Sequence, residues 1–119
     1  MSPMPRPDYK SHPLWAEAMA LAHEAYDVAE TLRPRDPEAA RLLRKAAVAV
    51  PARVAGALTA DEDVERATET VGARAALSEV AVRASGAPAS GKADALVRHA
   101  DSLSISVALA LTAAEERPS

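Results

Sequence analysis

Residues 93–114, ADALVRHADSLSISVALALTAA, carry the clearest helical pattern of this 119-residue chain. Apolar residues recur in this stretch at alternating spacings of three and four, which is typical of a helix in a coiled-coil-like bundle. The recurring positions are Ala93, Leu96, Ala100, Leu103, Val107, Ala110 and Ala114. We therefore expect a long helix that starts at Ser90 and presents this seam to other helices.

The second half of this helix is uncharged on every side. Ser102 to Ala114 is a run of 13 residues without Asp, Glu, Lys or Arg. A helix that is apolar all round is a buried helix, whereas each helix of a monomeric four-helix bundle keeps one face in water. We therefore predict that a second subunit covers this half, with an oligomer interface at Leu103, Ile105, Val107, Leu109 and Leu111.

Composition extends the helical interpretation to the rest of the chain. Thirty residues are Ala, which has the best helix propensity, and only four are Gly. We expect three further helices over Pro13 to Arg33, Pro37 to Leu58 and Asp61 to Ala84. Asp36 is the expected N-cap of the second helix, and Thr59 and Glu62 are expected to form a capping box at the start of the third. The predicted core stripe of the third helix is Val64, Ala67 or Thr68, Val71, Ala75, Leu77, Val80, Ala81 and Ala84.

Four helices of this length joined by short links predict an all-α fold, an antiparallel up-down-up-down four-helix bundle. Residues 1–10 hold Pro3, Pro5 and Pro7 and are expected to be a flexible N-terminal arm, and residues 11–117 are the single expected domain. Pro51 lies inside the second helix and predicts a kink there. The alanine-rich core is thin, so homo-oligomerisation would add stability.

The charges differ from helix to helix. The second helix carries a net charge of +3, whereas the first and third each carry −3. One interpretation is internal complementarity, in which the basic helix lies beside the two acidic ones. The other is a phosphate-binding patch, which could contact nucleic acid or a partner, formed by Arg41, Arg44, Lys45 and Arg53. The net charge of −3 for the whole chain disfavours strong nonspecific binding of nucleic acid.

Residues for catalysis or metal binding are not found at the spacings that such sites need. The chain has no Cys, and His12, His23 and His99 are not paired at metal-ligand spacing. We therefore expect a protein that is not an enzyme and holds no cofactor and no metal. The longest uncharged run is shorter than the roughly 20 residues of a membrane-spanning helix, and no signal peptide is apparent. A cytoplasmic location without membrane association is expected.

One segment of the second helix, residues 43–51, LRKAAVAVP, resembles the most recognisable motif of the small four helix bundle proteins first noted in intervening sequences of ribosomal RNA genes. The first expected helix is similar to that family's opening helix at Leu14-Trp15, Leu21 and Tyr26. Gly72 with Leu77 resembles the third-helix motif. The resemblance extends over roughly Tyr9 to Ala114. The chain departs from the family after Pro51, where ARVAGA replaces the usual SNIAEG, and at Ala76, where an acidic residue is usual.

The resemblance implies an antiparallel bundle that assembles as a homopentameric barrel without catalysis. A related branch, the accessory protein of diversity-generating retroelements, binds a reverse transcriptase and contacts nucleic acid through a positive surface. Two functions are therefore expected. The first is a non-enzymatic, homo-oligomeric scaffold or adaptor for another macromolecule. The second is a nucleic-acid-binding accessory protein of a reverse transcriptase.

Overall fold

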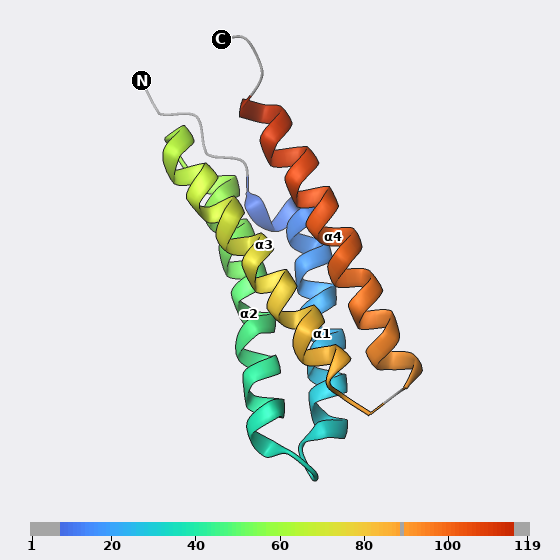
Figure 1. The fold of residues 1–119 in the computed structure, drawn as a ribbon. Helices are drawn as coiled ribbons and strands as arrows, with labels where there is room; N and C mark the ends of the chain where they lie inside the picture. Colours follow the sequence, from blue (N-terminus) through green and yellow to red (C-terminus); the bar gives the residue numbers. More distant parts are fainter. Residues whose placement is uncertain (1–7, 89, 116–119) are drawn as a thin grey trace.

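The computed structural model describes residues 8–88 and 90–115, and within these residues all regular structure is helical. A short 3-10 helix, η1, precedes four α-helices that pack against one another around one apolar core (Figure 1). Their bounds are Tyr9–Ser11 for η1, Pro13–Leu32 for α1, Pro37–Thr59 for α2, Asp63–Ser85 for α3 and Gly91–Glu115 for α4. The predicted all-α four-helix bundle is confirmed.

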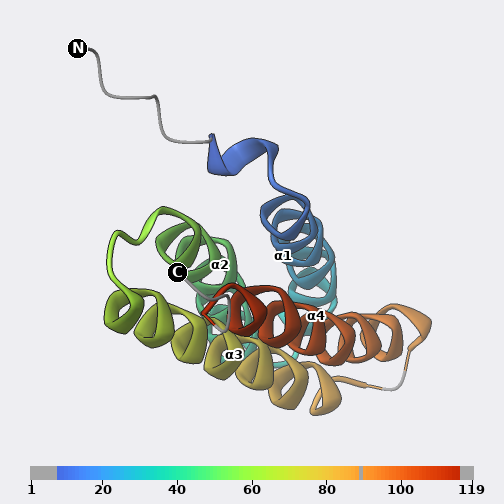
Figure 2. The ribbon, with the colours of Figure 1, turned by 90° about the horizontal axis from the view of Figure 1, so that it is seen from above.

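Each of the four helices has two lateral neighbours. α2 packs between α1 and α3, and α4 packs between α3 and α1. Viewed from above, α1 and α2 lie on one side of the bundle and α3 and α4 on the other (Figure 2). The seam between α1 and α4 is the loosest of the four. It joins the first helix to the last, so no short connection holds these two helices together.

The starts of α1, α2 and α4 follow from local capping. The Asp36 carboxylate accepts the Ala39 N–H at 3.0 Å and Pro37 follows at the first helical position, as predicted. His12 caps α1 through its Nδ1, which accepts the Leu14 N–H at 3.1 Å. The Ser90 hydroxyl accepts the Ala93 N–H at 3.1 Å. These three starts are decided by residues next to one another in the chain.

The predicted capping box at the start of α3 is wrong. Thr59 belongs to the last turn of α2, and its hydroxyl donates to the Ala55 carbonyl at 2.8 Å. α3 begins four residues later, at Asp63, and its N-cap residue Glu62 makes no side-chain capping bond. A Thr hydroxyl can bond back to the carbonyl of its own helix, and here that bond replaces the expected cap.

The predicted core stripe of α3 is wrong in its first half. Val64 and Val71 are exposed, and so is Ala75. The buried residues of α3 are Thr70, Ala73, Leu77, Val80 and Ala84. Thr70 tolerates burial because its hydroxyl donates to the Arg66 carbonyl at 2.7 Å. The stripe of valines therefore lies on the outer side of α3, opposite the core.

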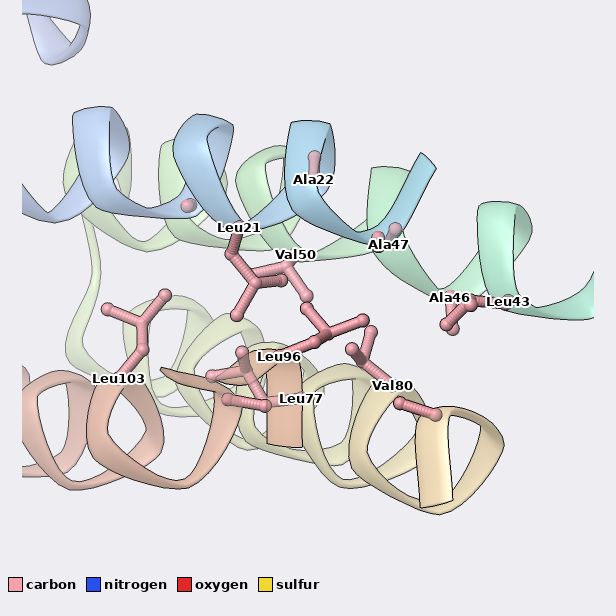
Figure 3. Packing of buried hydrophobic residues seen from close by; sticks show 14 of the residues in the cluster. Leu21, Ala22, Leu43, Ala46, Ala47, Val50, Leu77, Val80, Leu96 and Leu103 are labelled. Atoms are coloured by element: carbon pink, nitrogen blue, oxygen red, sulfur yellow. The ribbon is translucent and has the colours of Figure 1, made fainter. Parts of the chain in front are cut away.

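The core is built from few large side chains and many small ones. Leu21, Val50, Leu77 and Leu96 bring one fully buried side chain from each helix to the centre (Figure 3). Of the 25 buried apolar residues that the structure describes, twelve are Ala, which lets the helices approach closely. Pro51 is buried as well, and α2 continues through it from Pro37 to Thr59. The kink predicted at Pro51 stays a prediction.

The described part of the predicted N-terminal arm lies against the bundle. η1 packs on α1 and α2, and the Tyr9 ring meets the Trp15 ring edge-on with centroids 5.7 Å apart. Trp15 is partly buried against the core, whereas Tyr26 is 43% exposed. Residues 1–7 of the predicted arm and residues 116–117 of the predicted domain lie outside the described residues.

Candidate interaction surfaces

The predicted oligomer interface on α4 separates into two faces. Leu103, Val107 and Leu111 are buried in the core of the chain's own bundle. Ile105 and Leu109 point outward and are 61% and 68% exposed. The bundle itself covers one face of α4, so the prediction of a covering subunit now rests on Ile105 and Leu109.

A valine of α3 lies at the same level of the bundle as these two residues. Val71 is 68% exposed, on the side of α3 opposite the core. One turn from Val71, the Arg74 Nε donates to the Ser104 hydroxyl at 3.3 Å, and Ser104 directly precedes Ile105. Val71, Ile105 and Leu109 therefore share one stretch of the bundle, and we call these three residues the outer apolar face. Val64 and Val82 are exposed nearer the two ends of α3.

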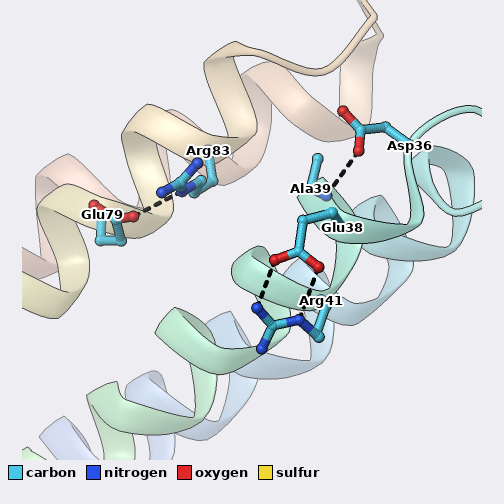
Figure 4. Close-up of polar contacts among 6 residues, drawn as sticks. All are labelled: Asp36, Glu38, Ala39, Arg41, Glu79 and Arg83. Carbon is cyan, nitrogen blue, oxygen red and sulfur yellow. Dashed lines mark hydrogen bonds and ion pairs between the residues drawn. The ribbon is translucent and has the colours of Figure 1, made fainter.

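Two of the four predicted basic residues are engaged in ion pairs. Arg41 donates from Nε to Glu38 Oε2 at 3.0 Å and from Nη2 to Glu38 Oε1 at 2.5 Å (Figure 4). This hydrogen bonding lowers the pKa of the Glu38 carboxyl and raises the pKa of the Arg41 guanidinium. Both side chains are exposed, so the pair neutralises Arg41 on the surface without anchoring another helix.

Arg53 pairs with α3. Its Nη1 lies 3.2 Å from Glu69 Oε1, and each partner lies against a glycine of the other's helix. A Cβ on Gly72 would lie 3.1 Å from Arg53 Cδ, and a Cβ on Gly56 would lie 2.5 Å from Glu69 Oε2. The two glycines thus make room for the pair between α2 and α3. Internal complementarity of charge is realised here.

Arg44 and Lys45 differ from Arg41 and Arg53. Neither forms an ion pair with any residue that the structure describes, and Lys45 is exposed while Arg44 is half-buried. Arg53 lies eight residues beyond Lys45, about 12 Å along the axis at 1.5 Å per residue. Arg41 and Arg53 are thus paired, whereas Arg44 and Lys45 have no ion pair among the described residues. That the four residues form one phosphate-binding patch stays a prediction.

A cluster that the sequence interpretation missed joins α4 to α1. His99 of α4 has a carboxylate at each ring nitrogen. Nδ1 lies 3.0 Å from both oxygens of Glu24, and Nε2 lies 2.7 Å from Glu17 Oε2. Burial lowers the pKa of His99, but the hydrogen bonds to Glu24 and Glu17 outweigh it, so that its pKa is raised above the ordinary 6.5. The seven-residue spacing of Glu17 and Glu24 places both on one helix face, but nothing local indicates which residue they meet.

A hollow lies in the same seam. Its volume is about 350 Å³, and Leu14 and Glu17 of α1 line it together with His99, Ser102 and Ser106 of α4. Among the side chains that the structure describes, in residues 8–88 and 90–111, no three His, Asp or Glu are grouped so as to hold a metal ion. Within the same residues, no helix has the length and apolar character needed to cross a membrane.

The sequence was also compared with known proteins. Neither a family model nor a curated protein matches this chain.

Proposed function

We propose that the chain is the subunit of a non-enzymatic, homo-oligomeric helical-bundle scaffold that serves as an adaptor for another macromolecule. The observation that carries this proposal is the outer apolar face, Val71, Ile105 and Leu109, each more than 60% exposed. Single exposed apolar residues are ordinary, whereas apolar residues that gather on one stretch of surface are typical of an interaction site.

The rest of the architecture fits a repeating subunit. Successive connections lie at opposite ends of the bundle in Figure 1, which supports the antiparallel up-down-up-down order that we propose for it. The core is rich in Ala and contains few large side chains, so burial of further apolar surface between subunits adds stability that one chain lacks. The resemblance to the four helix bundle proteins makes five the proposed subunit number, and the proposed location remains the cytoplasm.

The proposal is tested by native mass. Light scattering after size-exclusion chromatography is expected to give about five times the 12.4 kDa of the chain. In the double variant Ile105→Glu, Leu109→Glu, a charge on each residue opposes burial, so the mass is expected to fall to that of the monomer with unchanged helical circular dichroism.

Val82→Glu is the matched control, since Val82 is 63% exposed on α3 but lies away from the outer apolar face. This variant is expected to keep the oligomeric mass. A parent chain that is monomeric at micromolar concentration would contradict the proposal, and so would a double variant with the parental mass.

A second function is favoured by Arg44 and Lys45. Two cations without ion pairs among the described residues are available to phosphates, as a nucleic-acid-binding accessory protein of a reverse transcriptase would need. Binding of a structured RNA should weaken with added salt and with Arg44→Glu or Lys45→Glu. Lys92→Glu makes the same change in net charge on exposed α4 surface and should have little effect. No binding at low salt would exclude this function.

A further inference from the structure

The four helices enclose the core only if α1 and α4 hold together. Residues 33–36, 60–62 and 86–90 connect the other neighbouring helices directly. α1 and α4 have no such connection, because they are the first and last helices of the bundle. Closure of the bundle therefore depends on side chains that meet across this seam, and the polar contacts there converge on His99.

The protonation state of His99 decides how many of these contacts are favourable. An imidazolium carries a hydrogen on both nitrogens, so it can donate to Glu24 from Nδ1 and to Glu17 from Nε2 at the same time. A neutral imidazole carries one hydrogen only. Its other nitrogen then turns a lone pair towards a carboxylate, and that contact becomes repulsive.

We propose that Glu17, His99 and Glu24 form a proton-operated clasp, which closes the bundle between α1 and α4 when His99 is charged and loosens that seam when His99 loses its proton. The clasp is a property of the single chain, so it does not depend on the proposed oligomer.

The charged groups that act on His99 come from α1. Within the described residues, Glu24 and Glu17 of α1 are the charged groups that shift the pKa of His99, and none from α2 or α3 does. On α4 itself, Arg98 and Asp101 are exposed. His99 is 20% exposed, so water screens the pair contacts only in part.

The seam between α1 and α4 is not fully packed beside the clasp. The hollow of about 350 Å³ beside the clasp is lined by Leu14 and Leu103 as well as by Ser102 and Ser106. Leu14 and Leu103 are buried in the closed bundle. Loosening of the clasp would therefore admit water to these two leucines. The exposure of apolar surface beside the clasp then depends on pH.

The first test is a titration of His99 by NMR in the full chain. The parent for this experiment carries His12→Asn and His23→Gln, so that His99 is its one histidine. Asn at position 12 keeps a side-chain acceptor at the N-cap of α1, where His12 Nδ1 accepts the Leu14 N–H. The clasp predicts that His99 titrates above the ordinary 6.5 and that Glu17→Gln and Glu24→Gln each lower its pKa. Titration at or below the ordinary value, or no response to either variant, would overturn it.

The second test asks whether the proton acts on the seam or on the whole bundle. Hydrogen-exchange protection factors are measured in the same chain at about pH 6 and about pH 8.5, on either side of the range in which His titrates. Amides of α1 and α4 near the clasp are expected to lose protection several-fold more than those where α2 meets α3. His99→Gln keeps a hydrogen-bonding side chain without a titration and should abolish the difference. Equal loss in all four helices, or the same loss in His99→Gln, would overturn the clasp.

Discussion

The seam between α2 and α3 and the seam between α1 and α4 are held by polar contacts of different kinds. Arg53 and Glu69 lie in space that Gly56 and Gly72 leave between two helices that also share a three-residue connection. His99 lies between two carboxylates across helices with no connection of their own. A guanidinium is always charged near neutral pH, whereas an imidazole is charged only below its pKa. One seam is therefore permanent and the other depends on protons.

The largest effect that separates the two regions should come from apolar packing. Leu77 is fully buried at the centre of the bundle (Figure 3). Leu103 borders the hollow in the α1–α4 seam. Leu77→Ala leaves a closed cavity and should cost about 4 kcal/mol of unfolding free energy, while Leu103→Ala should cost about 2 kcal/mol, since its site already opens on a hollow. Urea denaturation measures both, and equal losses would show that the α1–α4 seam is packed as tightly as the centre.

A smaller effect is expected from the permanent pair. Glu69→Ala removes the partner of Arg53, and both side chains are partly exposed, so the loss should be about 0.5–1 kcal/mol. The loss should be the same at about pH 6 and about pH 8.5, because the ordinary pKa values of a carboxyl and a guanidinium both lie outside that range. Urea denaturation of parent and variant at both pH values measures this loss of unfolding free energy. A loss that differs between the two pH values would contradict the distinction between the two seams.

The stability contributed by the α1–α4 seam, in contrast, should change with pH. The folded pKa of His99 is raised, so the stability it contributes is complete below the unfolded value of 6.5 and is lost as pH rises through the folded pKa. His99→Gln should therefore destabilise the chain at about pH 6, by less than about 1 kcal/mol, and have little effect at about pH 8.5. The same denaturation series checks this sign, and destabilisation that grows with pH would contradict it.

The smallest effect is expected at Glu38. Its pair with Arg41 lies within one turn of α2 and joins no second helix. Glu38→Gln should leave thermal unfolding unchanged, because exposed pairs of this kind contribute little. A clear drop in the midpoint would mean that pairs within a helix matter here as much as pairs across seams.

Prediction from the sequence succeeded where neighbours in the chain decide the structure. Asp36 and Pro37 start α2 because capping needs only the residues of one turn. It failed on α3, where Val64 and Val71 suggested one stripe and the core uses Thr70 and Ala73 instead. Small residues contribute little to the hydrophobic periodicity of a helix, so the pattern of larger valines on the outer side predicts the wrong core face.

The candidate surfaces divide in the same way. The uncharged half of α4 is visible in the sequence, and it correctly indicates a helix with much apolar surface. The sequence could not show that Leu103 and Val107 face the chain's own core while Ile105 and Leu109 face outward. Which side of an apolar helix is covered depends on where the neighbouring helices pack, and this is set by the tertiary structure.

The amino-acid sequence alone was enough to predict the helical fold class, the starts of three of the four helices and the net charge of +3 on α2. Those features follow from propensity, capping and composition, which act within a few residues. The contact of Arg53 with Glu69 and the place of His99 between Glu17 and Glu24 arise only when the helices pack. These residues are far apart in the chain, and the packing of whole helices sets which of them come within hydrogen-bond distance.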